Sequence, residues 1–539
     1  MIDFNQVDID GSGSQTIALA KPETGIVKLF IWDGTNSLQP LSNTRKLSVN
    51  ISNGDPIYMD TSYSFEERAA DLVSRMTLEE KVSQVGYQAP AIERLGVAEY
   101  DYWKEALHGI ARQGKATSFP TALSLSNTWN RDLMYTVADI ISTEARAKNS
   151  RYNLSYWSPT VNMARDPRWG RNEETYGEDP YLSSQLGAEF VKGMQGDDPK
   201  YLKTIETLKH FAANNNEANR SSCSSLMTEF NFRNYYTIVF QDITEIVMPA
   251  SVMASYNGTS ITRNGEFIYN FIPSAANSYL LQDLLRRNWG FDGYVTSDCG
   301  AGEYAWGSNT REPNPAFQLG TLGSTTLPTE QYVAAFFQNG LNLECNLSGG
   351  NISTSYGVAA VENGYLSEEE LERVVYELFL QRFRTGEFDE GATYQDISSS
   401  EIETDENVAV AEEAAEESWV LLKNDDNMLP LSEEQTDNVA IIGNLADEIV
   451  LGDYTGQPTK TVTPVDGITE EVKSVNPDAE VNHYGVVTDD TLLFNVRSIN
   501  FVYGDGSKRA VDLTKATNVS GMTLNSDGTL TDVTPSAYA

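Results

Sequence analysis

One carboxylate in this sequence stands where a catalytic group would stand in an α/β protein. Asp298 follows the apolar run Tyr294–Thr296, which is entered through the glycine-containing turn 290–293. In a parallel α/β barrel, catalytic groups lie at the carboxyl ends of the strands. The small residues Gly300 and Ala301 leave room for a ligand, although an Asp in this position can also cap a following helix. Asp298 is therefore a candidate catalytic group, and its assignment depends on what accompanies it.

Other polar clusters also fall at the ends of expected strands. Lys209 and His210 end one apolar run and Tyr256 ends another, so in a barrel they would converge with Asp298 on one face. Lys, Arg, His and carboxylates hydrogen-bond sugar hydroxyls, and an Asp can attack an anomeric carbon. The combination predicts a sugar pocket. The clusters are residues 102–109, 157–174, 208–214 with Arg220 downstream, 253–258 and 297–298.

Some of these residues also have a structural explanation. Arg165 and Arg168 could belong to an ion-pair network that fixes a long loop, and His108 could be a core histidine with a satisfied partner. The pair Lys209 and His210 is harder to explain in this way, because burying an ammonium group requires charged or polar partners. We therefore favour a functional role for that pair.

The elements that would position these groups form an α/β pattern. Short apolar runs alternate with amphipathic helical stretches from about residue 61 to 390, which is typical of a parallel sheet and fits a (β/α)8-type barrel. Helix starts are expected at Ser64 and Thr77, each followed three residues later by Glu. Further helices are expected over residues 131–147, 181–194, 277–287 and 368–382.

The remaining segments predict further modules on either side of the barrel. Residues 1–60 resemble a partial β module, and 391–404 is polar and turn-rich like a linker. A smaller α/β sandwich domain is expected to start over 405–484, with buried strands at 420–422 and 439–443. Residues 485–539 have hairpin-like Asp-Gly turns and predict the start of an inserted β module that could bind carbohydrate.

Composition excludes several functional classes. Acidic residues outnumber basic ones by 77 to 38 in the 539 residues, a net charge of −39, which argues against nucleic acid and anionic membranes as partners. No run is apolar enough to span a membrane. Three cysteines cannot form a disulfide framework, and neither they nor the three histidines show metal-ligand spacing. The start lacks the features of a signal peptide, so either the protein is cytoplasmic or this chain begins inside a longer one. We expect the second, a part of a longer extracellular or cell-surface protein.

Taken together and in this order, the clusters resemble those of glycoside hydrolase family 3 over about residues 64–480. The resemblance implies a barrel followed by an α/β sandwich, a glycoside or oligosaccharide substrate, and no cofactor or metal. It places Asp298 at the family's nucleophile, which forms a covalent glycosyl-enzyme and retains configuration. The positions that resemble the family's sugar-binding residues are Glu105, Arg171, Lys209, His210, Arg220 and Tyr256.

Two residues resemble the β-xylosidase and α-arabinofuranosidase branch of that family. Glu105 stands where β-glucosidases carry Asp, and Cys299 stands where they carry Trp; the branch also implies that Cys299 could pair with Cys345. The expected function is therefore an exo-acting retaining β-D-xylosidase, with β-glucosidase as the alternative. The acid/base carboxyl group has no convincing candidate, because Glu448 and Asp453 are poor substitutes. A truncated, non-catalytic carbohydrate-binding protein is thus the alternative from another class.

Overall fold

The computed structural model describes residues 56–302, 328–346 and 352–485, together with short strands outside those ranges. The chain divides into two compact units, Met1–Trp419 with Gly452–Pro458, and Val420–Leu451 with Thr459–Ala539. Much of the predicted modules 1–60 and 485–539 lies outside the described residues. Apart from residues 56–60, which include a short 3-10 helix over Ile57–Met59, and residue 485, the described parts of these modules are strands. They are β1 (Val27–Leu29), β2 (Arg45–Leu47), β14 (Phe494–Asn495), β15 (Ser498–Val502), β16 (Lys508–Asp512), β17 (Thr523–Leu524) and β18 (Thr529–Thr531).

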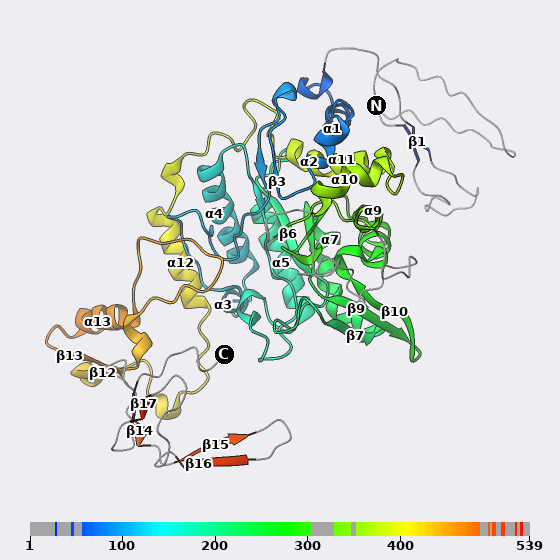
Figure 1. Cartoon of the computed structure of the whole chain (residues 1–539). Coiled ribbons are helices and arrows are strands. Elements are labelled where there is room, and N and C mark those ends of the chain that lie inside the picture. The colour runs from blue at the N-terminus through cyan, green and yellow to red at the C-terminus, as the bar shows by residue number, and fades with distance from the viewer. Residues whose placement is uncertain are drawn as a thin grey trace, which may run out of the picture. The chain divides into compact units, whose positions relative to one another are not determined.

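A ring of short strands lies at the centre of the first unit (Figure 1). Its parallel part has the order β11-β8-β6-β5, and parallel bridges extend it from Tyr156 to Lys104 on one side and from Thr296 to Leu343 on the other. A bridge between Gly86 and Glu344 and the pair β3–β4 close the ring. The strands are β3 (Gln88–Ala89), β4 (Tyr100–Asp101), β5 (Ser155–Tyr156), β6 (Ile205–Phe211), β8 (Ser251–Ala254) and β11 (Tyr294–Ser297).

This ring confirms the predicted barrel-type domain. It differs from a fully parallel barrel in one place, because β3 pairs with β4 in the antiparallel direction. Strand β6 is buried along its whole length, although it contains Glu206, Lys209 and His210. Its apolar and β-branched residues, such as Ile205 and Leu208, indicate a strand, whereas two-residue strands such as β3 and β4 carry almost no periodic signal.

Helices surround the ring (Figure 1). The expected starts at Ser64 and Thr77 are present as reciprocal capping boxes with Glu67 and Glu80, and the four other expected helices are also confirmed. Helices of the first unit are α1 (Phe65–Ser74), α2 (Leu78–Ser83), α3 (Ala122–Ser126), α4 (Arg131–Asn149), α5 (Pro180–Gln195), α6 (Glu229–Asn231), α7 (Ile238–Val247), α9 (Thr329–Gln338), α10 (Ile352–Glu362), α11 (Glu368–Arg384) and α12 (Asp405–Glu417), with a further helical segment over Tyr279–Asn288.

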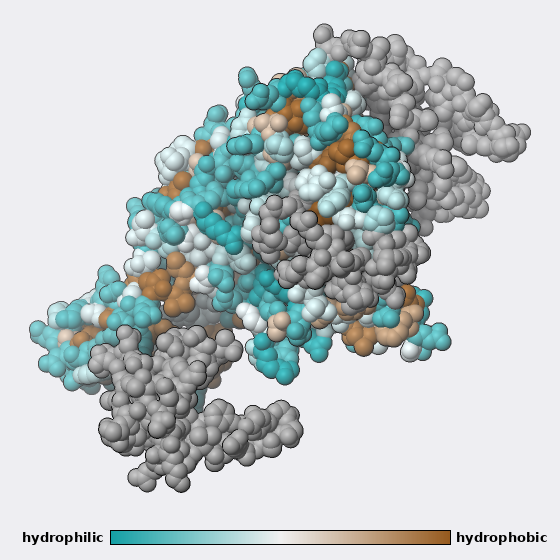
Figure 2. Space-filling model, in the orientation of Figure 1, coloured by the Kyte–Doolittle hydropathy of each residue, from teal (hydrophilic) through white to brown (hydrophobic). Residues whose placement is uncertain are grey.

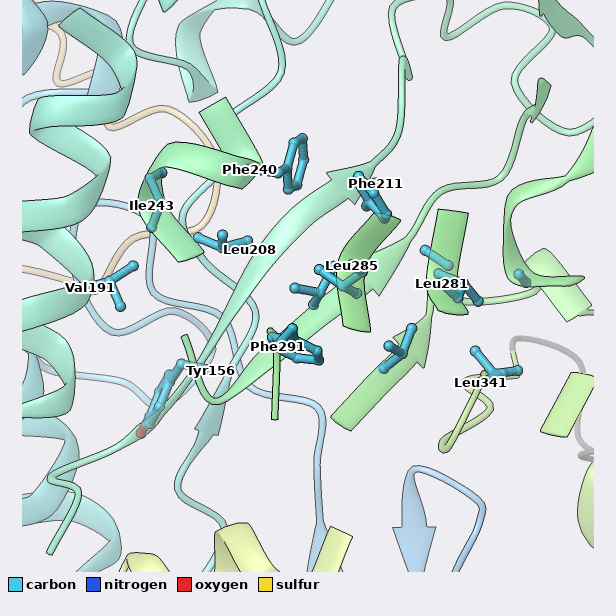
Figure 3. Packing of buried hydrophobic residues seen from close by; sticks show 14 of the residues in the cluster. Tyr156, Val191, Leu208, Phe211, Phe240, Ile243, Leu281, Leu285, Phe291 and Leu341 are labelled. Atoms are coloured by element: carbon cyan, nitrogen blue, oxygen red, sulfur yellow. The ribbon is translucent and has the colours of Figure 1, made fainter. Parts of the chain in front are cut away.

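The core forms where helices pack against the outer side of the ring. Leu208 and Phe211 of β6 lie against Phe240 and Ile243 of α7, close to Val191 of α5 (Figure 3). Each of these side chains is essentially fully buried, and burying such a side chain contributes about 1.5–3 kcal/mol. This packing holds the strand that carries Lys209 and His210 rigidly in place. The outer surface in Figure 2 is mostly hydrophilic, in keeping with the net charge of −39.

A three-stranded side sheet extends from the barrel loops. It consists of β7 (Ser224–Thr228), β9 (Gly258–Arg263) and β10 (Glu266–Pro273) in the order β10-β9-β7. Strand β7 follows the loop after β6, and β9 follows the loop after β8, so this sheet ties together two loops that leave the carboxyl ends of barrel strands.

The second unit contains a parallel strand–helix–strand arrangement. Strands β12 (Asn438–Ile442) and β13 (Glu480–Tyr484) pair in parallel, with α13 (Pro464–Val475) between them in the chain. This confirms the α/β character expected there and the strand near 439–443, but the predicted burial of that strand is wrong, because Ile442 is 71% exposed. The buried strand predicted at 420–422 is wrong: the segment pairs with no strand in the described chain, and Leu422 is 90% exposed.

The domain limits drawn from the sequence stay predictions. The structure keeps α12 with the first unit, although the predicted sandwich began at 405. The reason is polar anchoring as well as packing: Glu144 of α4 accepts hydrogen bonds from the Glu403 backbone and the Asn407 side chain, and Asn130 binds Glu417. Among the described residues, no helix is long and apolar enough to cross a membrane, and no group of His, Cys, Asp and Glu could hold a metal ion.

Candidate active site

The carboxyl ends of the barrel strands meet around one cavity. Lys209 and His210 belong to β6, Tyr256 follows β8, and Asp298 follows β11 directly. The cavity has an empty volume of about 530 Å³, which includes space open to solvent. All seven residues singled out from the sequence line it, together with five others. The lining residues are Trp103, Glu105, Trp157, Arg171, Lys209, His210, Arg220, Met253, Tyr256, Asp298, Cys299 and Tyr454.

Asp298 has one anchored and one free carboxylate oxygen. Its Oδ1 accepts a hydrogen bond from the Cys299 backbone N–H at 2.8 Å, and its own N–H donates to the Ala254 carbonyl at 2.9 Å. Its Oδ2 is buried and has no hydrogen-bond partner in the described chain, although the side chain keeps 13% exposure. The geometry fixes the side chain while leaving Oδ2 available to a bound molecule.

Burial and nearby cations act in opposite directions on this carboxyl group. Burial raises the pKa of Asp298 to about 6, while Arg171, Arg220 and Lys209 pull that pKa down and so limit the rise. The group is therefore mostly ionised at pH 7. An ionised oxygen without a hydrogen-bond donor is a better nucleophile than a solvated one, because no bound donor has to be displaced.

His210 faces Asp298 as a neutral side chain. Burial and the neighbouring cations hold the pKa of His210 well below its ordinary value. Its Nδ1 lies 3.0 Å from Oδ1 of Asn162, which as an amide oxygen can only accept, so Nδ1 carries the proton. The Nε2 atom, 3.6 Å from Oδ2 of Asp298, is then an acceptor. This explains why Oδ2 receives no hydrogen bond from His210, and it leaves Nε2 free to accept one from a hydroxyl.

Glu105 and Lys209 form a buried ion pair on the cavity wall. Lys209 Nζ lies 2.8 Å from Glu105 Oε2, and Trp103 Nε1 donates to Glu105 Oε1 at 3.1 Å. Lys209 Nζ also lies 4.6 Å from the centre of the Tyr454 ring. A buried ammonium group therefore has a partner on each side, as its burial requires. Both charges also face the cavity, where they can hydrogen-bond ligand hydroxyls.

The two arginines come from loops and are held by carboxylates. Both guanidinium contacts of Arg171 with Glu174 measure 2.7 Å, and this pairing raises the pKa of Arg171. Arg220 lies with its guanidinium carbon 4.4 Å from the centre of the Tyr256 ring and donates to Glu217 at 2.8 Å. Each arginine is paired with a carboxylate of its own loop, Arg171 with Glu174 and Arg220 with Glu217. Each loop therefore holds its own cation at the cavity.

A disulfide joins the loop after Asp298 to the next barrel segment. Cys299 is bonded to Cys345, the pairing implied by the family resemblance, and Tyr256 donates its hydroxyl proton to the Cys299 carbonyl. The link fixes the backbone immediately after Asp298, whose Oδ1 depends on the Cys299 N–H. Two segments distant in the sequence thus support the position of one carboxylate.

Several lining residues were not singled out from the sequence. Trp103 and Trp157 stack with ring centres 5.8 Å apart, and Met253 packs against the disulfide cysteines. Tyr454 comes from the segment Gly452–Pro458, which belongs to the first unit although its sequence neighbours do not. The sequence placed Tyr454 in the sandwich domain predicted over 405–484 and not at the pocket.

The structural alternatives considered for other residues fit the structure. Arg168 pairs with Asp166 in an exposed loop, and Arg165 contacts Tyr236. His108 is buried, with its ring nitrogens facing the carbonyl oxygens of Phe119 at 2.7 Å and Asp453 at 2.9 Å. None of these side chains lines the cavity.

Comparison with protein families identifies the family to which this fold belongs. The model described as "Glycosyl hydrolase family 3 N terminal domain" matches residues 87–373, and "Glycosyl hydrolase family 3 C-terminal domain" matches residues 419–532. The chain belongs to glycoside hydrolase family 3. The barrel-type first unit and the α/β second unit correspond to the two domains of that family.

Relatives in family 3 include several named xylosidases. "Xylan 1,4-beta-xylosidase" of Xylanibacter ruminicola is 35% identical over 438 residues, which cover 78% of this chain and 48% of that protein. An exo-1,4-beta-xylosidase of Emericella nidulans is 36% identical over 406 residues, covering 71% of this chain and 49% of that protein. This family 3 chain thus spans about half the length of these relatives.

Solved family 3 structures agree with the fold. A GH3 exo-beta-xylosidase in complex with a xylobiose aziridine probe superposes with a TM-score of 0.70 at 32% identity, covering 81% of this chain and 55% of that one. A GH3 beta-glucosidase of Bifidobacterium adolescentis gives 0.59 at 29% identity, covering 76% and 52%.

Proposed function

We propose that this chain carries the catalytic pocket of an exo-acting retaining β-glycosidase that releases single sugars from non-reducing ends, with β-D-xylosides as substrates. The observation that supports it most directly is the arrangement at Asp298: one anchored oxygen, one buried oxygen without a donor, and three cations nearby. The named relatives supply the sugar class, since several of them are xylosidases.

The chemistry follows from that arrangement. Oδ2 of Asp298 attacks the anomeric carbon while the bond from that carbon to the leaving-group oxygen breaks, which gives a glycosyl ester of Asp298. Water then attacks the same carbon and releases the carboxylate, so two inversions retain the configuration. Meanwhile Lys209 and Arg171 donate hydrogen bonds to hydroxyls, and Nε2 of His210 accepts one.

The group that protonates the leaving oxygen stays unassigned. In the described part of the chain, the carboxyl groups that line the cavity are Asp298 and Glu105, and Glu105 is already paired with Lys209. Asp453, one of the two substitutes considered from the sequence, does not line the cavity. Substrates with good leaving groups are therefore the appropriate probes, because they need little acid assistance.

The preference for a pentose is attributed to Glu105. Both its oxygens are held, by Lys209 at 2.8 Å and by Trp103 at 3.1 Å, so the carboxylate cannot swing out of the cavity. A carboxylate that reaches one methylene further than Asp would occupy the space needed by a hexose hydroxymethyl group. The second candidate, a β-glucosidase, is favoured by the β-glucosidase structures among the fold matches.

Exchange of this one residue distinguishes the two sugars. We expect Glu105→Asp to raise the ratio of 2,4-dinitrophenyl β-glucoside to β-xyloside hydrolysis by about 10-fold, because one methylene in a pocket is worth about 1–3 kcal/mol. Glu93→Asp, on an exposed short helix away from the cavity, is the matched control and should leave the ratio unchanged. If Glu105→Asp leaves the ratio unchanged, the pentose assignment is wrong.

A further inference from the structure

Glu217 lies outside the cavity lining but contacts both arginines that enter it. Its Oε2 accepts a hydrogen bond from Arg220 Nη1 at 2.8 Å, and its Oε1 lies 3.6 Å from Arg171 Nη1. The same Oε1 lies 3.4 Å from Nε1 of Trp169. One carboxylate, 24% exposed, thus joins the two loops that deliver cations to Asp298.

The two arginines differ in how firmly the rest of the chain holds them. Arg171 is 12% exposed and has two further contacts of 2.7 Å with Glu174. Arg220 is 36% exposed, and within the described chain its ion pair is the one with Glu217. Without that partner, the long Arg220 side chain has solvent available on one side and only the Tyr256 ring on the other. Arg220 is therefore the arginine whose position depends on Glu217.

We propose that Glu217 is a positioning residue for the reaction, which acts by holding the Arg220 guanidinium over Tyr256 and beside Asp298. The inference rests on the proposed function of the pocket, since it assigns the support for one of its cations.

Removing the charge of Glu217 has opposite consequences under the two explanations. The ionisable groups that act on Asp298 are Arg171, Arg220, Lys209 and the neutral His210. If Glu217 acts by position, Glu217→Gln lets Arg220 move away, a cation is lost, and the pKa of Asp298 rises. If Glu217 is only a nearby negative charge, its removal strengthens the attraction of the cations, and the pKa of Asp298 falls. The direction of the change therefore separates positioning from a simple charge effect.

The rate of covalent labelling by a 2-fluoro-xylosyl fluoride, followed from pH 5 to 8, tests this. In that step the bond from Oδ2 of Asp298 to the anomeric carbon forms and fluoride leaves, so no acid is needed. We expect Glu217→Gln to label about 10-fold more slowly near pH 6 and to shift the acid limb to higher pH, because a charge-assisted hydrogen bond is lost. Glu217→Asp keeps the charge on a shorter side chain, so its labelling rate should lie between those of the wild type and Glu217→Gln.

A matched control exists in α6, which follows strand β7 of the side sheet. Glu229 also pairs with two arginines, Arg233 at 3.1 Å and Arg263 at 2.8 Å, but none of the three lines the cavity. Glu229→Gln should therefore label like the wild type. This control separates the loss of an arginine pair in general from the loss of the pair at Arg220.

Dependence on Arg220 gives the decisive result. The double variant Glu217→Gln with Arg220→Gln should label no more slowly than Arg220→Gln alone, and Arg220→Gln alone should reproduce the pH shift even if Glu217→Gln is too unstable to assay. Additive losses, unchanged rates, or an acid limb that moves to lower pH would overturn the inference. A wild type that neither the xylo nor the gluco reagent labels would instead reject the proposed function, and this inference with it.

Discussion

Replacing Asp298 by Asn should stabilise the fold at neutral pH while it removes the nucleophile. The pKa of Asp298 is about 6 in the folded chain against an ordinary 3.8, because the ionised group is buried. The folded state therefore holds the proton more tightly than the unfolded state, so stability falls as pH rises from about 4 to about 6 and stays low above that. Asn has nearly the same size and no charge to bury.

The size of this effect follows from the two pKa values. At about 1.36 kcal/mol per pH unit, the cost of ionising Asp298 is about 1.6 kcal/mol at pH 5 and about 3 kcal/mol at pH 7.5. The advantage of Asp298→Asn over the wild type should thus grow by about 1.4 kcal/mol between these pH values. The lowest pH used is 5, because the sequence pI is ≈ 4.3 and solubility is lowest near the pI.

Urea unfolding of both proteins at pH 5 and 7.5, followed by tryptophan fluorescence, gives the comparison. Asp166→Asn is the control, because Asp166 is exposed and its pKa is lowered by Arg168, so that variant cannot gain stability as pH rises. An advantage of Asp298→Asn that stays constant or shrinks with pH would show that the carboxylate is not ionised at a desolvation cost, and would refute the electrostatic account of this site.

Three other measurements, on two variants and on the wild type, test neighbouring parts of the site. Lys209→Met should destabilise the first unit by about 3–5 kcal/mol, seen as a lower unfolding midpoint, because Glu105 would remain buried without its cation; an unchanged midpoint would contradict the buried pair. Wild-type labelling by an activated fluoride should fall below about pH 6 as Asp298 is protonated, and a profile that is flat down to pH 5 would contradict the raised pKa. Asn162→Asp should raise the pKa of His210, measured by NMR titration of its ring, because the new carboxylate would favour the imidazolium; an unmoved pKa would contradict the hydrogen bond to Nδ1.

The sequence allowed the strand ends to be predicted well and the loops poorly. Strand β6 and the strand before Asp298 are both buried, and each contains apolar or β-branched residues, so Lys209, His210 and Asp298 could be placed at or near strand ends from local pattern. Glu105, Arg171 and Arg220 lie in irregular loops without periodicity. The clusters that contain them were expected near the pocket, but these individual residues were chosen only through the family resemblance.

Other features depend on contacts between distant segments. Tyr454 reaches the cavity because Gly452–Pro458 packs on the barrel, where Thr455 donates to the His108 carbonyl, and nothing in the local sequence encodes that docking. The segment 420–422 was expected to be buried because Val and Leu favour strands, yet no strand of the described chain pairs with it. Propensity predicts a strand only where a partner strand is also present.

The most direct test of the central claim is the mass of the intact protein after incubation with a 2-fluoro-xylosyl fluoride. The account predicts a gain of one 2-fluoroxylosyl group, located by peptide mapping on Asp298 and absent from Asp298→Asn. A label on another residue, or no label on a folded chain with either the xylo or the gluco reagent, would contradict the assignment of Asp298 as the nucleophile of a retaining glycosidase.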